Sequence, residues 1–243
     1  MIIHILGSGA YPLRFSNGLS TSILLPEFGT ILDAGLGLTA LPADYRTDTL
    51  NILLSHFHHD HILGLAFLSN VLESGQAKRI RILGDERIKH LQAFFTEPFN
   101  PLFTASDLPI TMEYMNENFE SNGLRVKRKQ VKHATGFSNA FVFTDGTSTF
   151  GFSTDTTADA SNAPFFLGCS VLFHECNYDN ARKQTAIKEG HSYPEVIGKL
   201  ARASSIQKLY LIHTDPRFPA VAKEIAQTFP ASEITKDGQI ITI

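Results

Sequence analysis

The chain has no tryptophan, only two cysteines and no apolar run that approaches the length of a membrane span. Cys169 and Cys176 form no CxxC pair, so we expect a reduced, cytoplasmic protein in which both thiols are buried and inert. The opening MIIHILGSGAYP lacks the basic region and the cleavable apolar core of a signal peptide. The sequence therefore predicts a cytoplasmic location and no insertion into a membrane.

The chain also lacks an excess of charge of either sign, with 21 Lys and Arg against 24 Asp and Glu and a formal net charge of −3. Such a balanced surface does not attract nucleic acid through its overall field, so a phosphate-bearing substrate has to be held locally. The one basic cluster, RVKRKQVKH (125–133), places its charges on both faces of a strand. That pattern is typical of a solvated sheet edge rather than of an RNA track.

What the chain does have is extensive apolar patterning. It is 43% hydrophobic, without an internal repeat, a linker or a low-complexity run, so we expect one domain over residues 1–243 with a sizeable core. Short apolar runs with strand character recur at residues 2–6, 21–25, 30–33, 50–55, 79–83, 110–114, 124–133, 140–145, 149–154, 171–175, 209–213 and 239–243. One of the expected hairpins turns at Asp145-Gly146.

Helical periodicity is confined to three stretches, residues 60–75, 192–204 and 215–229. The second stretch begins with Ser192 three residues before Glu195, which is a capping-box pattern. Residues 95–109 are the least patterned, and we expect a loop or a short-helix excursion there. Because strands outnumber helices and do not alternate with them regularly, the sequence favours two sheets packed face to face with helices outside.

One short segment stands out chemically. Residues 55–64, SHFHHDHILG, place four histidines and an aspartate within six positions. His56 and His58 are two apart, so in an extended chain their side chains point the same way and converge on one ion. Asp60 and His61 fall where a helix begins, so the chain turns and directs a second pair elsewhere. Imidazole nitrogens and carboxylate oxygens are zinc ligands, so this loop predicts the beginning of two adjacent metal sites.

Three later strand-like segments each end in a further ligand, namely His133, Asp155 and His213. H-x-H-x-D-H followed by isolated His, Asp and His resembles the metallo-β-lactamase superfamily over nearly the whole chain. The resemblance implies an α+β fold, a four-layer αββα sandwich of two mixed sheets with helices on the outer faces. It also implies the ligands: His56, His58 and His133 for a first metal, Asp60, His61 and His213 for a second, and Asp155 bridging them. Two divalent ions per chain are expected, zinc first, with manganese and iron also compatible.

Four further segments resemble the ribonuclease Z branch of that superfamily, which includes a cyclic phosphodiesterase of phosphonate use: HILGSGAYPLRFSNGLSTSILL (4–25), LFHECNYDN (172–180), GHSYPEV (190–196) and IHTDPRF (212–218). In that branch the histidine of a G-H-S segment stands beside the leaving group as general acid, and by position this is His191. We assign catalytic roles to His191 and Asp60. Histidine is suited to deliver a proton near neutral pH. The alternative is that His191 only braces its loop through a hydrogen bond.

The resemblance therefore implies a binuclear metal-dependent hydrolase, a phosphodiesterase that acts through a metal-bridging hydroxide. The Gly-Pro-rich arm with which tRNA-processing ribonuclease Z grips tRNA is not found, because residues 84–109 are too short and too apolar. We favour a small or cyclic phosphodiester or a nucleotide derivative over tRNA as the substrate. Relatives are often dimers, so a homodimer is implied by the resemblance alone.

Three alternatives stay open: a ribonuclease Z-like endonuclease acting at RNA 3′ ends, a thioesterase or lactonase of the same fold, and a non-catalytic member that binds a ligand. The thioesterases usually place their third histidine in a G-H-x-x-G segment, whereas His133 stands in VKHATGF. Non-catalytic members often lose ligands, and all seven are present here.

The remaining polar residues near these motifs have supporting or surface roles. Histidines expected away from the metals are His59, His4 and His90. Hydroxyl groups expected to hold the Asp155 carboxylate are those of Ser153, Thr154 and Thr156, the last of which also caps the next segment of the chain. His174 with Glu175 either orients a ligand imidazole or supports packing. Arg217 is either a phosphate contact or part of a structural ion pair.

Overall fold

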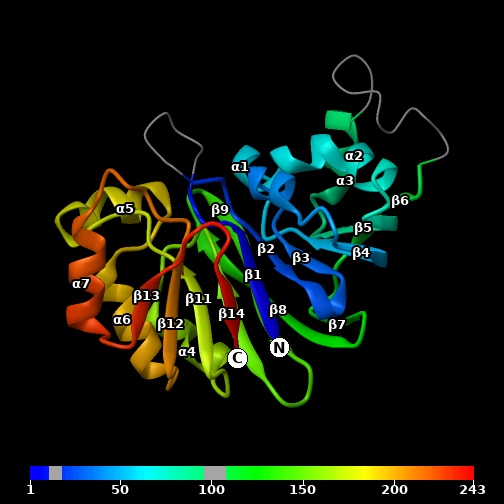
Figure 1. Cartoon of the computed structure of the whole chain (residues 1–243). Helices are drawn as coiled ribbons and strands as arrows, with labels where there is room; N and C mark the ends of the chain where they lie inside the picture. The colour runs from blue at the N-terminus through cyan, green and yellow to red at the C-terminus, as the bar shows by residue number, and fades with distance from the viewer. Residues whose placement is uncertain (11–17, 96–107) are drawn as a thin grey trace.

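The computed structural model describes residues 1–10, 18–95 and 108–243, which form two seven-stranded sheets (Figure 1). The strands of the first sheet are β1 (Ile2–Gly7), β2 (Ser22–Leu25), β3 (Thr30–Leu32), β4 (Thr47–Leu53), β5 (Ala77–Gly84), β6 (Ile110–Tyr114) and β14 (Ile240–Thr242). Those of the second are β7 (Asn118–Ser121), β8 (Leu124–His133), β9 (Gly136–Thr144), β10 (Thr149–Ser153), β11 (Val171–Glu175), β12 (Lys208–Ile212) and β13 (Ser232–Ile234). The strand orders are β14-β1-β2-β3-β4-β5-β6 and β13-β12-β11-β10-β9-β8-β7.

Each sheet is antiparallel on one side and parallel on the other. In the first sheet β14, β1, β2 and β3 pair antiparallel, and β3 to β6 pair parallel. In the second, β13 to β10 pair parallel and β10 to β7 pair antiparallel. Parallel strands bring their carboxyl ends to one edge of a sheet, where open α/β sheets place their binding residues. The segments after β3, β4, β10, β11 and β12 are therefore the natural place for a site.

Alternate side chains of each strand face different apolar layers, as the two-residue period of a strand requires. In β2, Ile23 and Leu25 belong to the core between the sheets, whereas Leu24 faces the outer layer. Phenylalanines of the second sheet fill much of the inter-sheet core, where Phe143 of β9 stacks on Phe150 of β10 with 4.9 Å between ring centroids. This burial of apolar surface is the main force that holds the sheets together.

Helices cover both outer faces (Figure 1). Those on the first sheet are α1 (His59–Ile62), α2 (Leu68–Glu73) and α3 (Ile88–Leu91). Those on the second are α4 (Ala163–Phe166), α6 (Pro194–Ala203) and α7 (Ala220–Thr228), with α5 (Lys183–Glu189) between α4 and α6 in the chain. The expected four-layer αββα sandwich of α+β class is confirmed.

All twelve strand-like runs form strands, with ends shifted by at most a few residues. Two strands were not expected, β7 and β13, and they are the two edge strands of the second sheet. They have four and three residues. An edge strand pairs on one side only and needs no long apolar run, so it carries a weak sequence pattern.

The single helix expected over residues 60–75 was wrong. The segment is broken into α1, a 3-10 helix over Leu63–Phe67 and α2. Gly64 lies in the break, where its N–H donates to the carbonyl of Ala34 at 2.8 Å. A Cβ atom at Gly64 would lie 2.3 Å from the carbonyl oxygen of Gly35, so the chain is pressed against its neighbour there and departs from α-helical geometry.

The capping box at the start of α6 was also wrong. The Oγ of Ser192 donates to the carbonyl of Thr156 instead of binding the helix. The N–H of Glu195 donates to Oδ1 of Asn180 at 2.9 Å. A side chain from another part of the chain therefore satisfies the free N–H at this helix start.

Three further expectations concern the cysteines, membrane-spanning helices and the least patterned segment of the chain. Cys169 and Cys176 are buried and unpaired, as expected. In the part of the chain that the structure describes, no helix is long and apolar enough to cross a membrane. The segments 95–109 and 84–109 fall partly on residues 96–107, which lie outside the described residues.

Candidate metal centre

The loop that carries His56, His58, Asp60 and His61 leaves the first sheet at the end of β4. The buried carboxylate of Asp33 holds this loop in place. Asp33, directly after β3, accepts hydrogen bonds from N and Oγ of Ser55 at 2.7 and 2.8 Å. Its Oδ2 also accepts from Nδ1 of His61 at 2.8 Å, between two fully buried side chains. A bond on Nδ1 fixes the ring so that Nε2 points into the site. Sequence reasoning missed Asp33, and the available signal was an acid directly after a buried strand.

The first group of ligands joins both sheets. His56 and His58 come from the loop after β4, His133 ends β8, and Asp155 lies just beyond β10. The Nε2 of His133 lies 3.2 Å from Nδ1 of His58. The Nε2 atoms of His56 and His133 lie 3.6 and 3.7 Å from Asp155 Oδ2. One ligand atom of each residue lies within 4.8 Å of the others, which is the spacing of a metal site.

The second group shares Asp155 with the first. Asp155 Oδ1 lies 3.1 Å from Nε2 of His61 and 3.1 Å from Nε2 of His213. Asp60 Oδ2 lies 3.2 Å from the same nitrogen of His213 and 3.5 Å from that of His61. The seven residues singled out in the sequence thus come together as two groups, and each oxygen of Asp155 faces one of them.

The backbone turns sharply where several of these residues are placed. Asp33, Asp155 and His213 have φ values of 57°, 29° and 51°. Such left-handed conformations cost a non-glycine residue about 1–3 kcal/mol and persist where surrounding contacts impose them. The N–H of His213 donates to Ser8 O at 2.7 Å, and the carbonyl of Asp155 accepts from Ser138 Oγ at 2.8 Å. The turns are therefore held by specific bonds, which preorganises the ligands.

The buried polar atoms of both groups fit divalent cations. Among the described residues, His56 Nε2, His61 Nε2 and Asp155 Oδ1 are buried without a hydrogen-bond partner, which is costly unless a cation completes them. Burial lowers the pKa of His56 well below its usual value, which keeps the ring in its metal-binding neutral form. Burial opposes ionisation of Asp155, but the surrounding histidines hold its pKa well below the usual range. His56 and Asp155 are therefore in the protonation states that a cation requires. Burial would lower the pKa of His61, but the carboxylates around it outweigh burial and raise that pKa well above its usual value, so a cation bound there would displace a proton from the ring.

A third constellation lies against the second group. Glu175, the last residue of β11, is fully buried, and its Oε1 accepts from Nδ1 of His191 at 3.0 Å and from the N–H of Thr156 at 2.9 Å. The ring of His191 stacks on that of His213 with 5.7 Å between centroids. Burial would lower the pKa of His191, but the carboxylate of Glu175 outweighs it and raises the pKa to about 9. The His191 ring therefore lies, hydrogen-bonded to Glu175, beside the second group of candidate ligands.

A family model of the β-lactamase superfamily domain matches residues 30–214. The chain belongs to the metallo-β-lactamase superfamily. It is 26% identical to a protein named ribonuclease Z from Azobacteroides pseudotrichonymphae, over 99% of this chain and 98% of that protein. The chain lies in the ribonuclease Z-like branch of the superfamily, as its sequence motifs indicated.

Solved structures of this superfamily share the fold. YhfI of Bacillus subtilis, a metallo-β-lactamase fold protein, has a TM-score of 0.80 at 19% identity, with 99% of this chain and 98% of that chain covered. The short form of human tRNase Z has a TM-score of 0.76 at 20% identity, with 100% and 99% covered. Yeast PDE1 has a TM-score of 0.76 at 16% identity, with 100% and 99% covered. These likenesses show that the chain has the metallo-β-lactamase fold, and its His and Asp clusters suit divalent metals.

The hydroxyl groups beside Asp155 were expected to hold its carboxylate through hydrogen bonds, and this expectation was wrong. Thr154 Oγ1 lies 3.0 Å from Ser55 Oγ, and Thr156 Oγ1 donates to the carbonyl of Lys132 at 3.0 Å rather than capping a helix. In the described structure none of these hydroxyls, nor that of Ser153, donates to the Asp155 carboxylate. Both carboxylate oxygens therefore face the two ligand groups.

The residues flanking the superfamily motifs divide into two kinds. Glu175 orients His191 rather than one of the candidate ligand imidazoles. His174 is buried, and its Nδ1–H donates to the carbonyl of Glu175 at 2.8 Å. Arg217 forms an ion pair with Asp215, with 2.7 Å between Nε and Oδ2. This pairing of Arg217 with Asp215 fits the expected structural ion pair.

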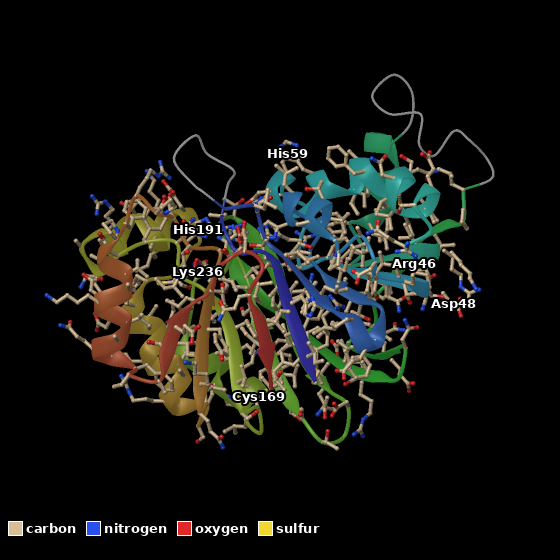
Figure 2. The ribbon with its side chains drawn as sticks, in the orientation of Figure 1. Arg46, Asp48, His59, Cys169, His191 and Lys236 are labelled. Carbon is tan, nitrogen blue, oxygen red and sulfur yellow. The ribbon has the colours of Figure 1, made fainter. Side chains whose placement is uncertain are left out.

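The other histidines lie apart from the metal centre, as expected. His59 is exposed and lies at the top of the molecule in the view of Figure 2. His4 is half-buried on β1, and His90 is exposed on α3. Among the described residues, none of these three histidines belongs to a group of side chains that could hold a metal ion.

Proposed function

We propose that the chain is a phosphodiesterase that uses two divalent metal ions. His56, His58 and His133 would hold the first ion, Asp60, His61 and His213 the second, and Asp155 would bridge them. The observation that supports this most is the position of the Asp155 carboxylate between the two groups. Its Oδ2 faces the first group and its Oδ1 faces the second. Histidine and aspartate ligands accept zinc, and also manganese or iron.

The residues around the ions would supply the rest of the chemistry. When bound, the two cations provide Lewis acidity that activates water and neutralises phosphoryl oxygens. His191 is placed to donate a proton to the leaving oxygen, because Glu175 engages its Nδ1 and leaves Nε2 toward the site. Fixing the donor in advance reduces the reorganisation that the transition state requires. The hydrogen bond between His191 and Glu175 fits a bracing role as well, and the place of the His191 ring against His213 and His133 supports the acid role.

The substrate class is inferred from charge and from the relatives. Ribonuclease Z, tRNase Z and PDE1 bear names of enzymes that act on phosphodiesters, which supports phosphodiester over thioester or lactone chemistry. The net charge of −3 offers no general attraction for RNA, so we favour a small or cyclic phosphodiester or a nucleotide derivative. RNA is the second candidate, because the ribonuclease Z relative matches over nearly its full length.

A substrate panel on protein of measured metal content tests the proposal. We expect hydrolysis of bis(p-nitrophenyl) phosphate and of cyclic nucleotides, no turnover of S-lactoylglutathione or acyl lactones, and slow cleavage of precursor tRNA. Fast thioester or lactone hydrolysis with idle phosphodiesters would overturn it. Faster cleavage of precursor tRNA than of any small substrate would select the second candidate. A single domain over residues 1–243 and a homodimer remain predictions.

A further inference from the structure

A buried polar network connects the two sheets next to the loop that follows β4. Asp85 lies directly after β5 of the first sheet, whereas Asn139 lies on β9 and Arg128 on β8 of the second. Asp85 and Asn139 are fully buried, and Arg128 is only 8% exposed. None of these three residues belongs to a group of side chains that could hold a metal ion. Their burial therefore needs an explanation other than ligation.

The side-chain amide of Asn139 lies between two charges that fix its orientation. Its Nδ2 donates to Asp85 Oδ2 at 2.7 Å, and its Oδ1 accepts from Nη1 of Arg128 at 2.8 Å. A flipped amide would turn its oxygen toward the carboxylate and its NH2 group toward the guanidinium, so both charges select the same orientation. In that orientation Nδ2 also donates to the carbonyl of Ser55 at 2.7 Å. Linked hydrogen bonds in a buried site polarise one another, so the two charges strengthen the bond to Ser55.

The carbonyl of Ser55 belongs to the peptide bond that joins Ser55 to His56, a candidate ligand of the first group. The backbone N–H of Asn139 donates to the same carbonyl at 2.9 Å, so two donors of one residue hold this peptide. Asp33 holds the N–H and Oγ of Ser55 and the ring of His61, which belongs to the second group. In the described structure Asn139 forms no hydrogen bond with a residue of the second group. Its hold is therefore specific to the first group.

The carboxylate of Asp85 is itself anchored. Its Oδ1 accepts from the backbone N–H and from Nε of Arg87 at 3.0 and 2.8 Å. The guanidinium of Arg87 lies 4.0 Å from the ring centroid of Phe137 and 5.4 Å from that of Phe57. Burial opposes ionisation of Asp85, but hydrogen bonds from Arg87 and Asn139 outweigh it and hold its pKa below the usual value. Asp85 is therefore a charged acceptor for Asn139.

We propose that Asn139, oriented by Asp85 and Arg128, is a positioning residue that sets the affinity of the first metal ion through the peptide between Ser55 and His56. The inference rests on the metal assignment of the proposed function and not on its substrate. Residues that orient metal ligands change metal affinity by about 10–100-fold when they are replaced. A purely structural role would weaken both ions together, whereas the proposed role concerns the first ion and the donor that faces Ser55.

Exchanging the two side chains separates these roles. Asn139→Asp places a carboxylate against Asp85 and removes the side-chain donor to Ser55. We expect a lower melting temperature of the metal-free protein and about tenfold weaker binding of the first ion. In the double variant Asp85→Asn/Asn139→Asp, the amide introduced at position 85 can donate to the carboxylate introduced at position 139. The melting temperature is expected to rise above that of Asn139→Asp, whereas the first ion stays about tenfold weaker, because a carboxylate cannot donate to Ser55.

Competition with a zinc chelator measures the two affinities, and His58→Ala identifies the ion. His58→Ala lacks a ligand of the first group, so adding Asn139→Asp to it is expected to leave the remaining affinity unchanged. Asn51→Asp is the matched control, since Asn51 is also fully buried and its Oδ1 accepts from Nη1 of Arg81 at 3.3 Å. It is expected to leave both affinities unchanged.

Unchanged affinity for the first ion in Asn139→Asp would overturn the inference, as would equal weakening of both ions or a double variant that regains the lost affinity. If the single variant does not fold, the double variant alone decides between these outcomes. Hydrolysis of bis(p-nitrophenyl) phosphate is measured separately on the wild type. Its absence, with metal binding that depends on Asn139, would overturn the phosphodiesterase assignment and not the role of Asn139.

Discussion

Single side chains decide whether the proposed centre can hold metal. His58 contributes its ring to the first group, 3.2 Å from Nε2 of His133. We predict that His58→Ala lowers the metal content by one ion per chain and lowers phosphodiester turnover at least a hundredfold, because packing cannot replace a lost ligand. Metal analysis of the dialysed protein and bis(p-nitrophenyl) phosphate kinetics measure both effects.

His90→Ala is the matched control, since His90 is an exposed histidine on α3. It is expected to keep both metals and full activity. A His58→Ala protein with unchanged metal content would contradict the ligand assignment.

His191 is expected to separate metal binding from turnover. We predict that His191→Ala retains both metals and lowers kcat about a hundredfold or more for substrates with alkoxide leaving groups, in line with the usual contribution of a general acid. The loss is expected to be much smaller for p-nitrophenyl esters, because that leaving group departs without a proton. Equal activity of variant and wild type toward both kinds of ester would exclude the acid role.

Glu175 is expected to set the pH range in which His191 is protonated. Its carboxylate raises the pKa of His191 to about 9, so the acid form persists below that pH and is lost as the pH rises through it. Cations bound near Asp155 and Asp60 oppose part of that increase. We predict that Glu175→Gln moves the alkaline limb of the kcat profile to lower pH, with alkyl phosphodiesters as substrates. An unmoved limb would assign that ionisation to another group.

The convergence of the seven candidate ligands could be predicted from the sequence, whereas the residues that hold them in place could not. His56, His58, Asp60 and His61 are close in the chain, and their spacing fixes how they point. Asp33 supports His61 across 28 positions of sequence, and Glu175 supports His191 across 16. Such pairs form only when separate strands come together, so a single sequence holds no spacing rule for them.

Among the elements, strands were more predictable than helices. The buried strands β2, β4 and β11 carry short apolar runs, because both of their faces pack against a layer of side chains. Helix ends depend on what touches them. Gly64 breaks the expected helix because Gly35 presses against it, and Asn180 replaces the expected cap of α6. Neither contact leaves a mark in the local sequence.

The turn between β13 and β14 is expected to tune the second metal group. Asp237 holds N and Oγ of Ser8 at 2.8 Å each and N of Leu19 at 2.6 Å, and Ser8 in turn holds the left-handed backbone of His213. We predict that Asp237→Asn weakens binding of one of the two metals about tenfold, because losing a charged acceptor loosens the chain that places His213.

Competition with a zinc chelator measures the two affinities separately. Asp145→Asn is the control, since Asp145 holds the turn between β9 and β10 through Thr147 and Ser148 and belongs to neither group of candidate ligands. Equal weakening of both metals in Asp237→Asn would point to a general loss of stability instead.

At the scale of the whole molecule, the candidate metal centre lies between the two sheets. The loop after β4 and Asp33 belong to the first sheet, whereas His133, Asp155 and His213 lie at the ends of strands of the second. A cation bound to both groups links the sheets at the edge where the loops turn, and it also offsets the buried carboxylates. Metal binding is therefore expected to stabilise the packing of one sheet on the other as well as the site itself.

We therefore predict that the melting temperature depends on free metal concentration. A ligand at a hundredfold excess over its Kd adds about 2.7 kcal/mol to the free energy of unfolding, if it does not bind the unfolded chain. For a chain of this size that corresponds to an increase of roughly 5–10 °C. Chelator should remove the increase and added zinc restore it, in a calorimetric scan. In His58→Ala the increase should shrink, and in His90→Ala it should not. If added zinc leaves the melting temperature of the wild type unchanged, the ions do not link the two sheets.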